Sequence, residues 1–243
     1  MSHSKTLFIS FMLLALLPGC KELKPYLDTA KDLAQSTAPT SQESAQAIRT
    51  TLDQGIEKAV AGLGKQGGFS SSRYRVPLPQ SLTDFASRAR QIGLGRYVDD
   101  FETSMNNAAE KAVPQALTIF KSSIRNMTLT DVVSLLRGGD TAITDFFRKN
   151  STTQLKSAFL PKVQQATSQV GVTQDYKRLT DQVSQYGRLL NIKPPAQLDL
   201  DTYVTDHAIA SLFTEIEGLE KNFRANPLQQ SSALIRKVFS YYQ

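Results

Sequence analysis

The apolar residues of this chain recur at helical spacing from residue 42 to the end, and this pattern constrains the fold more than any other feature. Residues three or four positions apart share one face of an α-helix, so each segment can bury a single stripe. The first such stripe consists of Ala47, Ile48, Leu52, Ile56, Ala59, Val60 and Leu63. Alternation typical of a strand is absent except for a few residues around Arg73 to Val76. We therefore predict a mainly α protein.

Turn-forming residues divide this pattern into successive helices. Thr40 with Glu43 predicts a capping box at the start of the first helix. Gly138 and Gly139 are expected to close a short helix, Asp140 to cap the next, and Pro161 to kink it. The prediction is one compact multi-helix domain over residues 42–243, with at most a small β-hairpin near residues 69–78.

The N-terminal segment has the features of a bacterial lipoprotein signal. Lys5 precedes an apolar run from Leu7 to Leu17, and Gly19 precedes Cys20. The run is shorter than the roughly 20 residues that a transmembrane helix needs. Residues 1–19 are therefore predicted to be a signal peptide, and residues 20–41 a lipidated N-terminus and tether with acyl chains on Cys20. The alternative is an ordinary buried cysteine.

The residue after Cys20 indicates a location. Lys21 stands there in place of an Asp, and in this the chain resembles lipoproteins sorted to the outer membrane. We therefore expect the protein to be lipid-anchored at the periplasmic face of the outer membrane. The membrane, contacted through the acyl chains, is its first predicted partner.

Composition argues against several classes of function. The net charge is +6, falling to +5 without Lys5, and the 28 Lys and Arg residues are interspersed with 22 Asp and Glu. Such dispersed charge does not predict nucleic-acid binding. Cys20 is the only cysteine, and His207 is the only histidine left once His3 is removed with the signal. No metal site, cofactor or catalytic residue is therefore predicted.

The order of several motifs resembles a known bacterial family. Gly68-Phe69 is followed by Arg-Val-Pro-Leu-Pro at 75–79, and a helix at 101–110 is followed by Gly-Gly-Asp-Thr at 138–141. This order, over roughly residues 45–243, resembles the bacterial domain of unknown function family numbered 4197. The resemblance implies an exported, largely helical protein and no known activity.

One helix carries a polar stripe beside its apolar face. At about 100° per residue, Asp99, Glu102, Asn106 and Glu110 fall within roughly 80° of arc. Carboxylates at such a boundary repel one another unless a cation lies between them. Ion pairing with an arginine is the principal interpretation. A polar ligand-binding cleft and an acid/base pair acting on an envelope glycan are the alternatives.

The Gly138-Gly139-Asp140-Thr141 turn is the second candidate. Free amides at a helix start can hold an anion, although a capping Asp140 would compete with it. Thr141, Thr144 and Arg148 share a helix face and are candidates to contact the acidic stripe. The candidate binding cleft therefore combines Arg73, Arg75, Glu102, Asn106, Glu110, Asp140, Thr141, Thr144 and Arg148.

The function predicted from these observations is non-enzymatic binding or scaffolding in the cell envelope, with an envelope protein or glycan as the partner. One alternative is a carrier of an apolar or lipid ligand, lined by Phe101, Phe120, Phe146, Phe147 and Phe159. The other is an envelope glycan hydrolase with a carboxylate pair among Asp99, Glu102, Glu110, Asp140 and Asp145. The sequence leaves the oligomeric state open.

Overall fold

A computed structural model describes residues 38–186, 193 and 198–242. The predicted signal peptide, Cys20 and the tether up to residue 37 lie outside the described residues. Residue contacts group Pro39–Gln243 into one unit and Met1–Ala38 into another. The fold described below is that of the first of these.

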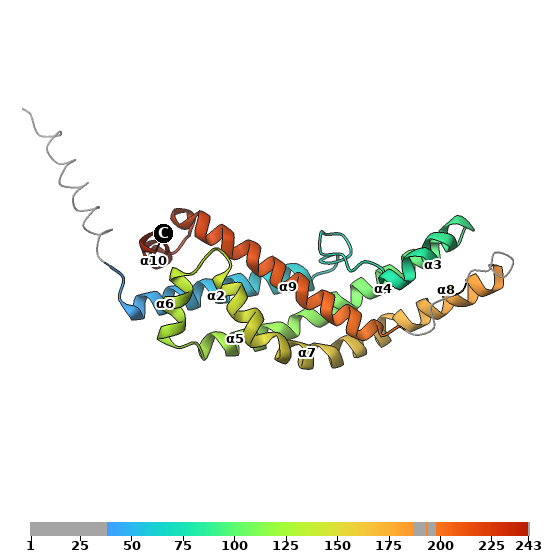
Figure 1. The fold of residues 1–243 in the computed structure, drawn as a ribbon, viewed down its shortest axis with the longest axis horizontal. Coiled ribbons are helices and arrows are strands. Elements are labelled where there is room, and N and C mark those ends of the chain that lie inside the picture. The colour runs from blue at the N-terminus through green and yellow to red at the C-terminus, as the bar shows by residue number, and fades with distance from the viewer. Residues whose placement is uncertain (1–37, 187–192, 194–197, 243) are drawn as a thin grey trace, which may run out of the picture. The chain divides into compact units, whose positions relative to one another are not determined.

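Helices form nearly all of the described chain (Figure 1). The α-helices are α2 (Ser41–Gly64), α3 (Gln80–Gln91), α4 (Gly95–Ala112), α5 (Ala116–Arg125), α6 (Leu129–Arg137), α7 (Ala142–Val170), α8 (Val172–Tyr186), α9 (Leu200–Ala225) and α10 (Ala233–Tyr241). The 3-10 turns of the described ranges are η1 (Val113–Gln115) and η3 (Pro227–Gln229). The predicted mainly α class is confirmed. Residues 69–78 form turns and extended backbone, and no strand occurs in the described ranges.

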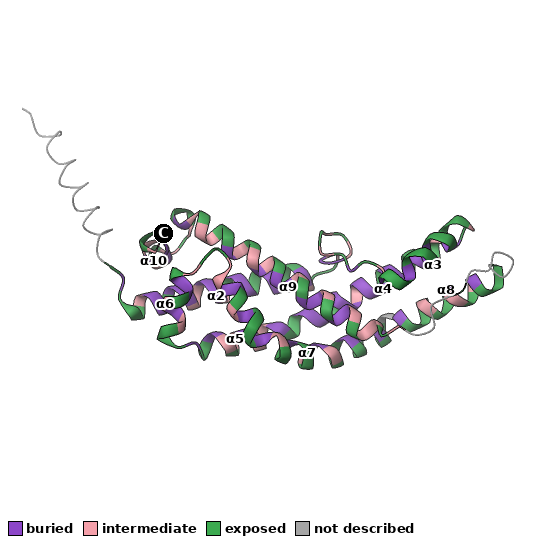
Figure 2. Ribbon diagram, viewed as in Figure 1, coloured by how far each residue is buried: buried purple, intermediate pink, exposed green. Residues whose placement is uncertain are grey.

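The long helices α2, α4, α7 and α9 pack on one another and enclose the core (Figure 2). Within this unit α3 packs on α4, and α8 packs on α4 and α7. At the other end α6 and α10 both pack on α2 (Figure 1). No helix in the described part is both long and apolar enough to cross a membrane.

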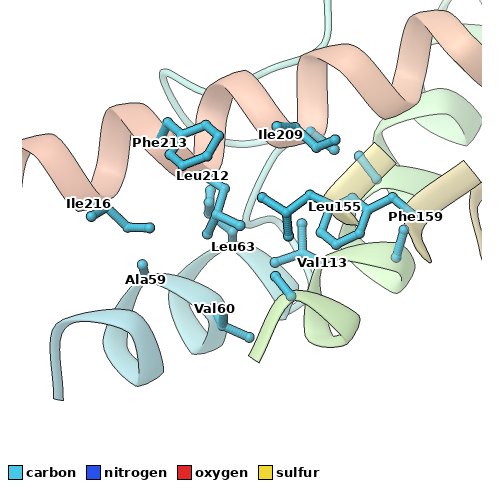
Figure 3. Packing of buried hydrophobic residues seen from close by; sticks show 14 of the residues in the cluster. Ala59, Val60, Leu63, Val113, Leu155, Phe159, Ile209, Leu212, Phe213 and Ile216 are labelled. Atoms are coloured by element: carbon cyan, nitrogen blue, oxygen red, sulfur yellow. The ribbon is translucent and has the colours of Figure 1, made fainter. Parts of the chain in front are cut away.

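The centre of the core lies where α9 faces α2 and α7 (Figure 3). Leu212, Phe213 and Ile216 of α9 are buried against side chains such as Leu63 of α2 and Leu155 of α7. Each apolar side chain buried in this way contributes about 1.5–3 kcal/mol to stability. The core therefore joins segments that are far apart in the sequence.

The helix ends agree with most of the sequence signals. Thr40 and Glu43 form the predicted capping box on α2, and Thr128 forms a second one with Asp131 on α6. The expectation for Asp140 is wrong: the residue before α7 is Thr141, and neither side chain caps the helix. An acidic residue of α9 bonds the first amides of α7 instead, as described below. α7 continues through Pro161.

Candidate functional site

The segment between α2 and α3, residues 65–79, is an irregular strap across α4. It leaves α2 through a turn that requires glycine. Gly67 has φ +79°, and a Cβ on Gly68 would lie 2.3 Å from the carbonyl oxygen of Leu63. Other residues are strained at a positive φ, and a main-chain oxygen cannot move aside. The glycines therefore set the direction in which the strap leaves the helix.

Two strap side chains, Phe69 and Val76, are fully buried, so their backbone groups are withdrawn from water and need partners. The polar stripe of α4 supplies them. Glu110 Oε1 accepts hydrogen bonds from the amides of Phe69 at 3.0 Å and Ser70 at 3.2 Å. Asn106 accepts from the Val76 amide at 2.8 Å and donates to the Val76 carbonyl at 3.1 Å. Asn106 thus bonds Val76 as a neighbouring strand would.

Glu102 lies one helical turn before Asn106. We call Glu102, Asn106 and Glu110, together with the strap groups that they bond, the strap cluster. Its carboxylate is paired with Arg75 of the strap and, at 3.4 Å, with Arg90 of α3. Arg90 also contacts Asp99 at 2.6 Å. The like charges of the stripe are therefore bridged by guanidinium groups, which confirms the ion-pairing interpretation for Glu102 and Asp99.

α9 holds the strap at other points. The Tyr74 hydroxyl donates to Glu215, and burial is the main cause that raises the pKa of this tyrosine. Arg73 contacts Glu215 at 3.4 Å. The Tyr203 hydroxyl donates to the Pro77 carbonyl at 3.1 Å. The strap is consequently fastened to two helices.

A second buried group, the terminal cluster, joins α6, α7 and α9. The Glu220 carboxylate of α9 accepts from the amides of Ile143 at 3.0 Å and Thr144 at 2.9 Å, and from the Thr144 hydroxyl at 2.7 Å. Arg224 pairs with Glu220 at 2.9 Å and donates to the Leu135 carbonyl at 2.8 Å. A carboxylate at the start of one helix and a cation at the end of another both match the helix dipoles.

The other predicted site residues lie around α7. Thr141 donates to Asp145 at 2.9 Å, and Arg148 pairs with Asp145 at 2.7 Å and with Glu217 at 3.6 Å. Asp140 is exposed. Within the described ranges, no hydrogen bond or ion pair joins Asp140, Thr141, Thr144 or Arg148 to the strap cluster. The residues of the predicted cleft therefore occupy two places, and Arg148 does not pair with the acidic stripe.

The contacts bear on the hydrolase alternative. Asp99, Glu102 and Asp145 pair with arginines, and Glu110 bonds backbone amides. Only Asp140, of the five candidate carboxylates, has neither kind of partner in the described part. No group of three or more His, Cys, Asp or Glu that could hold a metal ion occurs there either.

Three of the five proposed carrier residues, Phe120, Phe146 and Phe147, pack against one another. Phe120 meets Phe147 edge-on with ring centroids 5.6 Å apart, and Phe146 meets Phe147 at 5.5 Å. A small apolar pocket between α2 and α9, beside Gly55 and Phe223, has about 20 Å³ and is lined by none of these rings. That volume is room for about one water molecule.

The sequence interpretation did not single out Glu220 or Arg224. One signal was available, because Glu220 falls on the same helix stripe as Phe213 and Ile216, which are buried. A charge on a buried stripe must be paired or bonded, and Arg224 one turn later is its natural partner. The bonded amides of α7 lie 76 and 77 residues earlier in the chain, so no local pattern indicates them.

Comparison with known families places both clusters within one homologous region. A family model for DUF4197, described as a protein of unknown function, matches residues 38–240. The chain belongs to the DUF4197 family. The match includes the strap, the terminal cluster and every described helix except the last residue of α10. No curated protein and no solved structure matched.

Proposed function

We propose that this DUF4197 protein is a lipoprotein, anchored through Cys20 at the periplasmic face of the outer membrane, and that it binds an envelope partner without catalysing a reaction. The signal pattern from Lys5 to Cys20 supports export and acylation. Twenty residues lie between Cys20 and the first residue of α2, Ser41, which leaves a tether for the domain.

One observation supports the non-catalytic part of the proposal. The carboxylates and the amide of α4 that were candidates for chemistry are bonded to the strap, through Arg75, Val76 and Phe69. Groups committed in this way position backbone and are not free to bind or activate a substrate. An anchor that concentrates the protein at one surface suits an adaptor, since a modest affinity then suffices.

Acylation is tested by mass spectrometry of the N-terminal peptide from cells that express the full chain and, as control, Cys20→Ser. The expected result is a triacylated or diacylated Cys20 as the first residue of the mature chain, and membrane fractionation that the substitution abolishes. An unprocessed N-terminus in the native chain would overturn the anchoring. Density fractionation of the two membranes then tests the outer-membrane location.

Crosslinking in cells tests the partner. An envelope protein or glycan recovered with the native chain and lost with Cys20→Ser would support an anchored binding role. Recovery of no envelope component above background would contradict it. Turnover of an envelope glycan by the purified chain would favour the hydrolase alternative instead.

A further inference from the structure

Large apolar side chains are exposed mainly at one end of the helical unit. In the described ranges four such side chains are exposed by half or more, and three of them are Leu129 at 50%, Leu228 at 68% and Tyr241 at 51%. They lie in α6, η3 and α10, while the fourth, Tyr186, ends α8. Single exposed apolar residues are ordinary, but their concentration at one end calls for a cause.

The elements that carry them lie beside the first turns of α2. Lys237 of α10 pairs with Glu43 at 2.8 Å, and Arg49 donates to the Met127 carbonyl, just before α6, at 2.8 Å. η3 packs on α10. Figure 1 shows α6, α10 and the start of α2 at the same end of the unit, with α3 and α8 at the other. We call the end formed by α6, α10 and the start of α2 the anchor-proximal face, because the chain from Cys20 enters it.

The same face carries arginines that lack acidic partners. Arg125 ends α5, Arg137 ends α6, and Arg236 lies in α10. No carboxylate of the described residues forms an ion pair with any of the three. Arg236 is fixed by the carbonyls of Gln230 at 2.6 Å and Ser231 at 3.0 Å. Each such cation near an anionic membrane surface contributes about 1 kcal/mol of attraction.

An open groove of about 560 Å³ lies between α6, α9 and α10. Arg137 supplies a cation, and Phe239 and Tyr242 supply apolar wall. Lys221 also lines the groove and is paired with Glu217 at 2.6 Å. Arg224, which also lines the groove, is already bonded to Glu220. Asp140 contributes the one carboxylate among the residues that line it. Cations beside an apolar wall match a phosphate linked to a glyceride.

We propose that the anchor-proximal face binds an anionic lipid bilayer, with Leu129, Leu228 and Tyr241 inserted among the headgroups and a lipid phosphate in the groove. The inference rests on the proposed anchor at Cys20. Twenty residues reach at most about 70 Å when fully extended, so the anchor keeps this face close to lipid. The far end of α2 lies about 36 Å further on, since the helix has 24 residues.

The test uses the full chain with Cys20→Ser, so that no acyl chain contributes to binding. Its partition onto vesicles of phosphatidylcholine with one third phosphatidylglycerol is compared with that onto phosphatidylcholine alone by sedimentation. Binding to the anionic vesicles is expected, weaker at higher salt because added ions screen the arginines. Equal partition onto both vesicles, or none onto either, would overturn the proposal.

Side-chain variants locate the contact. Combined Leu129→Ser, Leu228→Ser and Tyr241→Ser should lower the partition coefficient by about tenfold or more. Arg125→Gln and Arg137→Gln should each lower it by about fivefold. The matched controls are Tyr186→Ser and Arg88→Gln, exposed residues of α8 and α3, and these should leave binding unchanged. An equal loss in the controls would assign binding to the protein's overall charge and contradict the proposed face.

A competition experiment distinguishes recognition of a lipid headgroup from recognition of free phosphate. Soluble glycerol phosphate and inorganic phosphate are titrated as competitors against the vesicles. Competition by glycerol phosphate alone would support headgroup recognition in the groove, while equal competition by both would overturn it. Acylation of Cys20 is measured separately, so an acylated protein that fails to bind vesicles would refute this inference and leave the anchor intact.

Discussion

In the strap cluster the backbone that needs partners is irregular, whereas in the terminal cluster it is the first turn of a helix. Glu110 and Asn106 bond a segment that has no secondary structure of its own. Glu220 bonds two amides that the start of any α-helix leaves unpaired. In both places a polar side chain of one helix substitutes for missing main-chain partners.

The settings differ in how the charge is balanced. In the strap cluster Arg75 and Arg90 approach Glu102 from the protein surface, with about half and two fifths of each side chain exposed. In the terminal cluster the Arg224 side chain is only 13% exposed and its partner Glu220 only 3%. Removing Glu102 therefore leaves solvated arginines, whereas removing Glu220 takes the ion pair from a buried Arg224. Buried polar clusters of similar geometry can thus differ widely in energetic importance.

Glu220→Leu should have the largest effect. It removes three acceptor contacts and breaks the buried ion pair with Arg224, so the free energy of unfolding should fall by about 3–5 kcal/mol. Urea denaturation measures the change. Glu217→Leu, on the same helix and paired only at the surface, should cost no more than about 1 kcal/mol. Equal losses for the two would remove the distinction between the clusters.

Asn106→Leu should cause the second-largest loss in the free energy of unfolding. The Val76 amide and carbonyl would both lose their bonds to this side chain while Val76 stays buried, at a cost of about 2–4 kcal/mol. Asn107→Leu, the next residue on α4 and only partly buried, should change the free energy of unfolding by about 0.5 kcal/mol or less. Hydrogen exchange at Val76 provides a local readout, and its protection should fall in Asn106→Leu alone.

Replacing one glycine near each cluster by alanine should distinguish the two clusters further. A Cβ on Gly68 would meet the Leu63 carbonyl at 2.3 Å, whereas one on Gly138 would meet the Ala142 Cβ at 2.3 Å. In each Ala variant the free energy of unfolding should fall by about 1–3 kcal/mol because of overpacking. Adding Ala142→Gly should recover part of the loss in Gly138→Ala but none in Gly68→Ala, as thermal unfolding would show.

Gly62→Ala is the control for these substitutions, because nothing lies within 4 Å of the added methyl group. It should raise the free energy of unfolding by about 1 kcal/mol through helix propensity. Destabilisation by this variant would indicate that replacing glycine in α2 is harmful for a reason other than a clash.

The smallest effect is expected for Glu43, a half-buried residue in the first turn of α2. Its hydrogen bond with Lys237, followed by that with Thr40, lowers its pKa to about 2 from 4.5. A depressed folded-state pKa stabilises above the unfolded value, so this contribution is complete above pH 4.5 and disappears as pH falls towards 2. The melting temperature of Glu43→Gln should therefore converge on that of the native chain in acid. A constant difference from pH 7 to 2.5 would contradict the assignment.

The sequence predicted the helices better than the tertiary contacts between them. The capping box at Thr40 and the end of the short helix α6 at Gly138 are local signals, and each is confirmed. The polar stripe of α4 was also visible, because helical geometry alone places Glu102, Asn106 and Glu110 on one arc. Its partner was not, since the strap that it bonds lies some 30 to 40 residues away.

The wrong expectation for Asp140 and the absence, among the described residues, of the small hairpin that the sequence allowed at most have the same origin. Asp140 was expected to cap α7 because it stands at the right position in the sequence, but Glu220 reaches the same amides through tertiary packing. The short extended stretch near Val76 looked like a hairpin strand, but its hydrogen bonds go to the Asn106 side chain instead of a second strand. In both cases a distant side chain satisfied the backbone.

The cap that α9 places on α7 also has a consequence for the order of folding. A helix that carries its own capping residue can start before the rest of the chain arrives, as α2 does with Thr40 and Glu43. The first turn of α7 lacks such a residue, and its amides gain their side-chain partner only when Glu220 of α9 packs beside them. During synthesis from the N-terminus, we expect that turn to stay frayed until the chain beyond residue 220 has been made.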